Sequence, residues 1–178
     1  MQITDHWIEG IRQVPSPNRN ERPTSEISLI VIHGISLPAG RFGGDAVEAL
    51  FCNRLDTGAR GFRSLAGVEV SSHVFIRRDG EVVQFVPFNE RAWHAGDSRY
   101  GFRRDCNDFS VGIELEGTDL TRYEDVQYEM AAQICQALMQ HYGVMDIAGH
   151  CHISPGRKTD PGPLFNWSRL RSLLASRL

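Results

Sequence analysis

The stretch SEISLIVIHG, residues 25–34, predicts a strand that is buried on both faces. Its apolar run from Ile27 to Ile32 is short, almost unbroken and rich in β-branched residues, as expected of a strand covered on both sides. His33 follows at the end of this run. Because a lone histidine at a strand end is more often structural than catalytic, His33 indicates chemistry only if other reactive groups gather around it.

Residues 71–88, SSHVFIRRDGEVVQFVPF, alternate with the period of a strand on both sides of a turn signal. The Asp79-Gly80 dipeptide favours the positive φ angles of a tight turn. This segment therefore predicts a β-hairpin.

A second alternating run, FSVGIELEG (109–117), predicts a strand on which Glu114 and Glu116 share one face. Two carboxylates on one face can simply be solvated. Glu114, however, lies between apolar neighbours, where an ionised acid is costly unless it has a partner or a role. Glu114 is therefore the better candidate for catalysis.

Apolar residues at helical spacing predict three helices, the first within residues 43–55. The second covers residues 124–142, where Thr121 and Glu124 fit a capping box. The third begins near Asn166 and continues to the C-terminus. Because strands and helices are interleaved and one hairpin is present, we expect a mixed α/β (α+β) fold, with a central mixed β-sheet flanked by helices.

Length and composition are those of an ordinary globular protein. The chain has 178 residues, of which 41% are hydrophobic and 23% charged, and this length suits one domain with a real core. We expect residues 1–178 to form a single domain. The formal net charge of −3 provides no basic stripe for nucleic acid, and no protein partner is implied.

The N-terminus, MQITDHWIEGIRQV, lacks the apolar core of a signal peptide, and no later stretch approaches the ~20 apolar residues of a membrane span. We therefore expect no membrane association and a cytoplasmic location. The four cysteines lie far apart and form no C-x-x-C pair, so reduced thiols are the simplest interpretation.

The segment GHCHISPGRKTDPG (149–162) gathers two histidines, a cysteine, a lysine and an aspartate where two prolines and three glycines oppose a regular helix. A catalytic zinc takes three nitrogen, sulfur or oxygen ligands, and two histidines with one carboxylate is a common set. The candidate ligands in the chain are His33, His73, His94, His150, Cys151, His152 and Asp160. Residue type and spacing alone do not choose between His150 and His152, or between His33 and His73.

The same residue types indicate how such a site would work. Lys158 and Asp160 are two positions apart and can point to the same side of an extended segment. A metal makes a water more acidic, Glu114 can accept its proton, and Lys158 can stabilise the oxyanion formed when a carbonyl is attacked. Together these are the parts of an amide hydrolase.

Four stretches together resemble the AmpD-type N-acetylmuramoyl-L-alanine amidases of the amidase_2 and peptidoglycan-recognition superfamily. They are VIHGISLPAGRFGG (31–44), SSHVFIRRDGEVVQFVPFNERAWHAG (71–96), CNDFSVGIELEGTD (106–119) and GHCHISPGRKTDPGP (149–163). The resemblance extends from about Trp7 to Trp167, and the combination is far more specific than any single motif.

The resemblance implies a zinc enzyme whose metal ligands are His33, His150 and Asp160, with Glu114 and Lys158 as catalytic residues. It implies a central mixed β-sheet packed by helices, with the metal in a groove. The reaction it implies is hydrolysis of the amide between the lactyl group of 1,6-anhydro-N-acetylmuramic acid and L-alanine, in cell-wall recycling. The implied substrate is a small muropeptide.

The resemblance also implies substrate contacts at Trp93 and His94, in AWHAG. Gly34 departs from the pattern, because several relatives carry an asparagine there that can touch the peptide. Glu69 and Asp105 stand where arginines can grip the stem peptide, and the arginines that can compensate are Arg60, Arg63, Arg103 and Arg104. Of these we include Arg103, with Gly34, among the expected substrate contacts.

Three alternatives compete with this interpretation. One is a peptidoglycan-binding protein of the same fold without activity, which the complete set of ligand and catalytic residues disfavours. Another is a zinc amidase that acts on intact cell wall outside the cytoplasm, which the absence of a signal segment disfavours. The third is a structural protein with histidines in its core, which metal analysis would separate from the others.

Overall fold

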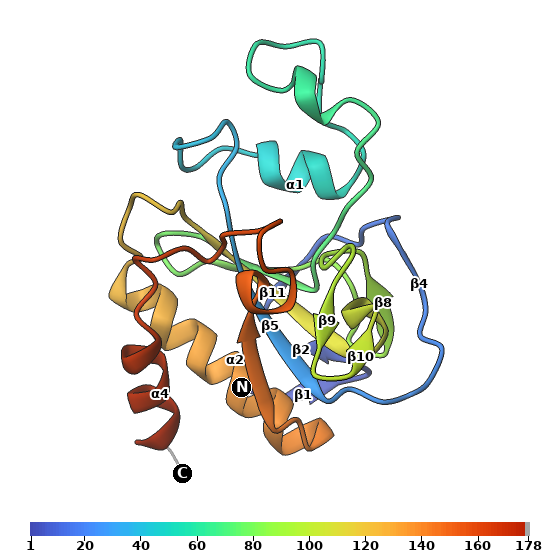
Figure 1. The fold of residues 1–178 in the computed structure, drawn as a ribbon, viewed down its shortest axis with the longest axis vertical. Helices are drawn as coiled ribbons and strands as arrows, with labels where there is room; N and C mark the ends of the chain where they lie inside the picture. Colours follow the sequence, from blue (N-terminus) through green and yellow to red (C-terminus); the bar gives the residue numbers. More distant parts are fainter. Residues whose placement is uncertain (177–178) are drawn as a thin grey trace.

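The computed structural model describes residues 1–176 of the protein. Its central element is a six-stranded sheet with the strand order β12-β5-β11-β6-β7-β3 (Figure 1). The strands are β3 Arg12–Gln13, β5 Leu29–Ile35, β6 Val74–Ile76, β7 Val82–Gln84, β11 Ser110–Glu116 and β12 Asp146–Gly149. Strands β12, β5, β11 and β6 are parallel, whereas β7 runs antiparallel to β6. The sheet is therefore mixed, as the sequence predicts.

Short strand pairs and helices surround this sheet. The strand pairs are β1 Ile3–Thr4 with β2 Trp7–Ile8, β4 Arg19–Glu21 with β8 Glu90–Ala92, and β9 Arg99–Tyr100 with β10 Arg103–Arg104. The α-helices are α1 Ala46–Phe51, α2 Asp125–Tyr142, α3 His150–Ile153 and α4 Trp167–Ala175, and the 3₁₀ helices are Arg63–Leu65 and Cys106–Asp108.

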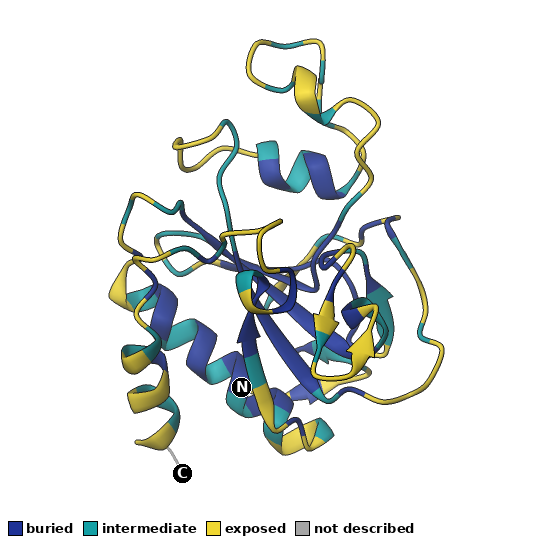
Figure 2. Cartoon of the chain, viewed as in Figure 1, coloured by how far each residue is buried: buried dark blue, intermediate teal, exposed yellow. Residues whose placement is uncertain are grey.

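Strand β5 is buried because neighbouring strands pair with both of its edges and its two faces are covered (Figure 2). Ile30 and Ile32 belong to the core cluster that contains α2, whereas Leu29 and Val31 belong to a separate cluster on the other face. His33 lies two positions after Val31 and therefore shares its face of the strand, so the His33 side chain lies on the face opposite α2.

Helices α2 and α4 pack against each other beside the sheet (Figure 1). The predicted capping box at the start of α2 is wrong in its residues. The Glu124 N–H donates to Gln127 Oε1 over 3.0 Å, so the box joins Glu124 with Gln127 and not with Thr121. Helix α4 begins after Asn166, as predicted, and the Asn166 side chain accepts the Arg169 N–H over 2.9 Å. Its predicted continuation through residues 177–178 lies outside the described residues.

Two segments differ from the helical predictions. Helix α1 ends at Phe51, earlier than its apolar pattern suggests, and Asn53 adopts a left-handed conformation with φ 56° that cannot continue a helix. The segment 149–162 contains one helical turn, α3, despite its prolines and glycines. This turn fits because both prolines lie beyond it, at Pro155 and Pro161.

The predicted hairpin is confirmed, with its turn at residues 78–80. Arg77 N–H donates to Glu81 O over 2.8 Å, which closes a three-residue loop in which Gly80 has φ +88°. Asp79 does not share the positive φ angle that the dipeptide suggested.

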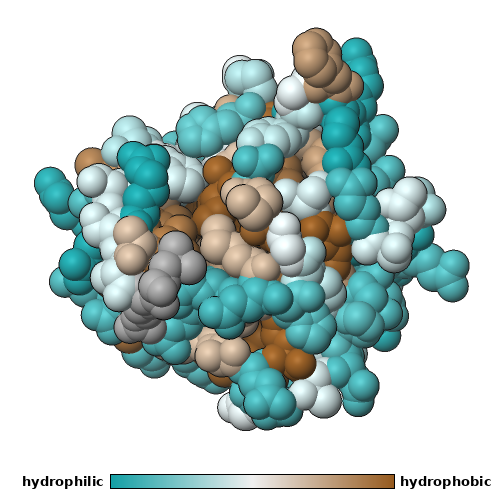
Figure 3. All heavy atoms as spheres, turned by 90° about the horizontal axis from the view of Figure 1, so that it is seen from below, coloured by the Kyte–Doolittle hydropathy of each residue, from teal (hydrophilic) through white to brown (hydrophobic). Residues whose placement is uncertain are grey.

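The surface offers no large exposed apolar area among the residues shown in Figure 3, where hydrophobic patches are broken up by hydrophilic side chains. Large apolar residues with high exposure are isolated, such as Phe102 at 98% and Leu120 at 89%. None of the helices within residues 1–176 is long and apolar enough to cross a membrane.

Candidate metal centre

Three reactive side chains meet where parallel strands end at one edge of the sheet. His33 lies near the end of β5 and pairs directly with Glu114 of β11. On the other side of β5, Gly149 pairs with Ile32, so His150 follows β12 at nearly the same level as His33. Because the carboxyl ends of parallel strands lie at the same edge, topology brings together residues that are far apart in sequence.

Two histidines and one aspartate direct one atom each to a common point. His33 Nδ1 lies 3.0 Å from His150 Nδ1 and 3.2 Å from Asp160 Oδ2, and His150 Nδ1 lies 3.1 Å from the same oxygen. Ligand atoms bound about 2.0–2.1 Å from a tetrahedral zinc lie roughly 3.3 Å apart. The three separations therefore suit a tetrahedral metal ion, and no other group of three or more His, Cys, Asp or Glu side chains among residues 1–176 has metal-ligand spacing.

A backbone carbonyl determines which nitrogen of His150 is free. His150 Nε2 lies 3.0 Å from Ala95 O, which can only accept, and 3.4 Å from Arg157 Nη2, which can only donate; the shorter contact favours a proton on Nε2. In a neutral imidazole the lone pair is then on Nδ1, the atom that points at His33 and Asp160. His150 is thus held in the tautomer that a metal ligand requires.

Burial and neighbouring side chains together set the charges of this group. It lowers the pKa of His33 to about 4, although the adjacent Asp160 carboxylate opposes the shift. Burial alone would raise the pKa of Asp160, but the His150 and His33 rings outweigh it and hold that pKa well below its ordinary value. The set is a neutral His33 and an ionised Asp160, as metal binding requires.

Glu114 is buried beside this group without a full set of partners. It is 8% exposed, its Oε1 lies 3.9 Å from His33 Nδ1, and its Oε2 has no hydrogen-bond partner. Burial, and then the charge of Asp160, raise the pKa of Glu114 well above its ordinary value, while Lys158 opposes the shift. An orphaned buried carboxylate oxygen of this kind indicates a missing cation or water.

The site opens into a cavity of about 180 Å³. Ile35, Phe51 and Val70 give it an apolar wall, and Lys158 is an exposed cation at its edge. The complete lining is Gly34, Ile35, Phe51, Val70, Ser71, His94, Glu114, His150, Lys158 and Asp160. Lys158 and Asp160 thus face the same space, as their spacing suggests.

The competing histidines lie outside the group. His73 is fully buried, and its Nδ1 accepts the Gly112 N–H over 3.0 Å. His152 Nδ1 accepts the Gly149 N–H over 2.9 Å, and its ring packs against Trp167. Both rings are therefore held by contacts away from the point where His33 and His150 meet.

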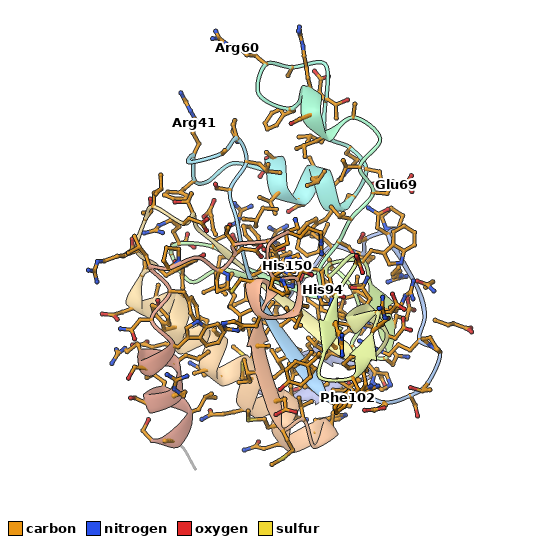
Figure 4. All side chains as sticks on the ribbon, viewed as in Figure 1. Arg41, Arg60, Glu69, His94, Phe102 and His150 are labelled. Atoms are coloured by element: carbon orange, nitrogen blue, oxygen red, sulfur yellow. The ribbon has the colours of Figure 1, made fainter. Side chains whose placement is uncertain are left out.

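The expected substrate contacts fall into two sets. Gly34 and His94 line the cavity, whereas Trp93 and Arg103 do not. Trp93 Nε1 donates to Asn20 Oδ1 over 2.7 Å. Arg103 donates to both carboxylate oxygens of Glu26, over 2.6 and 3.1 Å. In Figure 4, Phe102, the neighbour of Arg103, lies well below His94 and His150.

His94 itself is 8% exposed and makes its closest contact with a member of the candidate group. Its Nδ1 lies 2.9 Å from His33 Nε2. Burial, followed by the nearby histidines, lowers the pKa of His94 well below its ordinary value, so this imidazole is neutral.

A larger hollow of about 700 Å³ lies between α1 and the β6–β7 turn. Four of its charged side chains pair with one another: Arg12 contacts Glu48 over 2.8 Å and Glu81 over 3.0 Å, and Arg77 contacts Glu81 over 2.9 Å. Among residues 1–176, the lining of this hollow contains no histidine and no cysteine, so it lacks the metal-ligand set found beside the smaller cavity.

Comparison with known proteins assigns the family. Residues 23–163 match the Amidase_2 family, described as N-acetylmuramoyl-L-alanine amidase. The chain belongs to this amidase family. The amidase is 51% identical over 178 residues to the 1,6-anhydro-N-acetylmuramyl-L-alanine amidase AmpD of Citrobacter freundii, an alignment that covers 98% of this chain and 95% of the relative.

Solved structures support the fold of the amidase. A crystal structure of an AmpD selenomethionine derivative superposes with a TM-score of 0.95 at 49% identity, over 98% of this chain and 99% of that chain. The amidase AmiD of Escherichia coli, solved with anhydro-N-acetylmuramic acid-L-Ala-D-γ-Glu-L-Lys, gives a TM-score of 0.61 at 26% identity, over 86% and 60%. The predicted fold class, the family resemblance and the expectation of an amidase enzyme are confirmed.

Sequence reasoning about the amidase missed two residues that support the site. Ser110 lies on the same face of β11 as Glu114, four positions earlier, and period-two alternation was a signal that would have found it. Tyr123 donates its hydroxyl proton to Pro161 O over 2.8 Å, directly after Asp160. No spacing rule connects Tyr123 with that loop.

Tyr123 also explains why residue 34 of the amidase is glycine. A Cβ at Gly34 would overlap the Tyr123 hydroxyl, so a side chain such as asparagine does not fit beside this tyrosine. We predict that Gly34→Ala destabilises the protein by about 1–3 kcal/mol, the usual range for overpacking. The loss should be smaller in a Tyr123→Phe background, where the overlapping atom is absent.

Urea denaturation of the two single variants and the double variant measures this coupling. Tyr123→Phe alone is the matched control, because it removes the Pro161 hydrogen bond without adding a side chain. Strictly additive changes in the free energy of unfolding would contradict the predicted overlap.

Proposed function

We propose that this amidase is a zinc enzyme that hydrolyses the amide between the lactyl group of 1,6-anhydro-N-acetylmuramic acid and L-alanine in muropeptides, a step of cell-wall recycling. The observation that carries the proposal is the convergence of His33 Nδ1, His150 Nδ1 and Asp160 Oδ2 beside the unpartnered Glu114 Oε2. The close similarity to AmpD amidases along almost the whole chain supports the substrate.

The ligand chemistry favours zinc. Two imidazole nitrogens and one carboxylate oxygen form a three-ligand set that leaves a fourth tetrahedral position free, as in catalytic zinc sites. The 180 Å³ cavity is bordered by His150 and Asp160, so a substrate in the cavity would lie close to an ion that these residues hold. We assign His33, His150 and Asp160 as the ligands.

The residues around the ligands have separate tasks in hydrolysis. Zinc, when bound, polarises the scissile carbonyl and makes the attacking water more acidic. Glu114, which lines the cavity and has one unpartnered oxygen, accepts the proton of that water and later delivers it to the departing alanine nitrogen. Burial raises the pKa of Glu114 and favours its protonated form. A bound zinc ion would lower this pKa again, so Glu114 would be ionised, and able to act as a base, in the zinc-bound enzyme.

Lys158 supplies positive charge at the border of the cavity. Its side chain borders the cavity, near enough to Glu114 and His33 to influence the pKa of both. We assign it to stabilise the negative charge that develops on the lactyl carbonyl oxygen. The apolar wall of Ile35, Phe51 and Val70 limits water around the substrate.

The proposal extends to the organisation of the chain. We propose that residues 1–178 form one amidase domain, because a single core cluster includes residues from Ile3 to Leu170. We also propose a cytoplasmic location, since all four cysteines are free thiols, as a reducing compartment maintains them. Gly34 and His94 border the substrate cavity, whereas contacts from Trp93 or Arg103 would require those side chains to move.

The metal assignment predicts one tightly bound zinc per chain. Replacing His33, His150 or Asp160 by alanine should abolish stoichiometric zinc, because each change removes one of three protein ligands. His152→Ala, Cys151→Ala and His73→Ala are the controls and should retain zinc near the wild-type level. Elemental analysis measures all six variants, and loss of zinc from a control would show that the ligands are wrongly assigned.

The catalytic assignments predict slow enzymes that still hold zinc. Glu114→Gln keeps the shape but removes the base, and Lys158→Met removes the cation with little change in length. Each should lower turnover by roughly 10²- to 10⁴-fold, the usual range for proton-transfer and oxyanion effects. Turnover is measured by release of peptide from anhydro-muropeptide. Near-normal turnover in either variant would show that the role assigned to that residue is wrong. A variant that folds but binds no zinc would show that the residue is a metal ligand.

The substrate assignment predicts preference for soluble 1,6-anhydro-muropeptides over polymeric cell wall. Mass analysis of peptide released from each substrate by the zinc-loaded enzyme makes the comparison. Release from intact sacculi as fast as from anhydro-muropeptides would instead support an amidase that acts on the wall.

A further inference from the structure

His94 has a role in the structure that substrate binding does not explain. It is buried at the inner end of the cavity, and both of its ring nitrogens contact other side chains of the protein. Nδ1 lies 2.9 Å from His33 Nε2, and Nε2 lies 3.3 Å from Ser110 Oγ. Neither nitrogen is left to bind a substrate.

The protons in this chain of contacts have only one consistent arrangement. Ser110 Oγ lies 2.5 Å from Cys106 O. Because a carbonyl oxygen cannot donate, the serine hydroxyl donates this hydrogen bond to Cys106 O. Ser110 Oγ must then accept from His94, so the proton of His94 is on Nε2. His94 Nδ1 is left with a lone pair.

The same reasoning continues to His33. Since His94 Nδ1 accepts, His33 Nε2 must donate, and the neutral His33 ring has its lone pair on Nδ1. That atom is the one directed at His150 and Asp160. A backbone carbonyl thus sets the tautomer of His33 through Ser110 and His94, as Ala95 O does directly for His150.

Strand β11 is built to hold His94 in this place. A Cβ at Gly112 would lie 2.6 Å from His94 Cγ, so the ring occupies the space that a side chain would take. Ser110, Gly112 and Glu114 occupy alternate positions on one face of β11. The first accepts from His94, the second makes room for it, and the third faces the metal-ligand group.

We propose that His94 is a positioning residue that fixes the tautomer and ring orientation of the ligand His33, with Ser110 as its anchor. The inference rests on the proposed zinc centre and adds two residues to it. Outer hydrogen-bond partners of this kind typically change metal affinity by 10- to 100-fold when they are removed.

Four variants test this role. His94→Phe keeps a ring but removes the acceptor for His33, whereas His94→Asn retains an acceptor oxygen close to the position of Nδ1. Ser110→Ala removes the anchor and lets the His94 tautomer change. Ser72→Ala is the matched control, because Ser72 is equally buried and its hydroxyl has no hydrogen-bond partner.

The measurement is the dissociation constant for zinc, obtained by competition with a chromophoric chelator, together with the visible absorption spectrum of the cobalt-substituted protein. We expect His94→Phe to weaken zinc binding by roughly 10- to 100-fold and to alter the cobalt spectrum. His94→Asn should recover most of the affinity, and Ser110→Ala should weaken binding several-fold relative to Ser72→Ala.

Wild-type affinity and an unchanged cobalt spectrum in both His94→Phe and Ser110→Ala would overturn the positioning role while leaving the zinc centre in place. If His94→Phe does not fold, the comparison of Ser110→Ala with Ser72→Ala decides the question. A wild-type protein that binds no zinc would instead overturn the proposed metal centre, and this inference with it.

Discussion

The parallel pairing of β5 with β11 is the constraint on which the rest of the site depends. It sets Glu114 directly opposite His33, while the pairing of β12 on the other side brings His150 to the same edge. A shift of one residue in either register would turn the affected side chains to the opposite face, toward α2. The burial of Ile30 and Ile32 against that helix prevents such a shift, so hydrophobic packing on one face determines the chemistry on the other.

Sequence patterns predicted the strands and the type of fold because the spacing of apolar residues along the chain reflects which faces of an element pack against the core. The alternation in FSVGIELEG is a local property, and β11 forms there over Ser110–Glu116, although all seven residues of the strand are buried. The choice of His33 over His73 was different, because both histidines adjoin strands and only the pairing of those strands separates them. The start of α2 near Glu124 was predicted, but its capping box was assigned to Thr121 and Glu124, whereas the contact with Gln127 shows that Glu124 and Gln127 form it.

The candidate site combines groups that are unfavourable when each is considered alone. Glu114 is a buried carboxylate with an unpartnered oxygen, and the lone pairs of His33 and His150 converge on the ionised Asp160. A folded protein tolerates such an arrangement when the rest of the structure is well satisfied. Here the large core around β5 and α2 provides that stability, and a cation would relieve the repulsion among the converging lone pairs.

The segment between His150 and Asp160 is closed at its base by two contacts. The Cys151 N–H donates to the backbone oxygen of Asp160 over 2.8 Å, and His150 Nδ1 lies 3.1 Å from Asp160 Oδ2. His150 and Asp160 therefore form a compact local unit, whereas His33 lies 117 positions before His150 in the chain. A metal shared by all three acts as a cross-link between the N-terminal and C-terminal parts of the sheet. Closing so long a loop in the unfolded chain is entropically costly, so the ion would hold β5 and β12 together much as a disulfide would in an oxidising compartment.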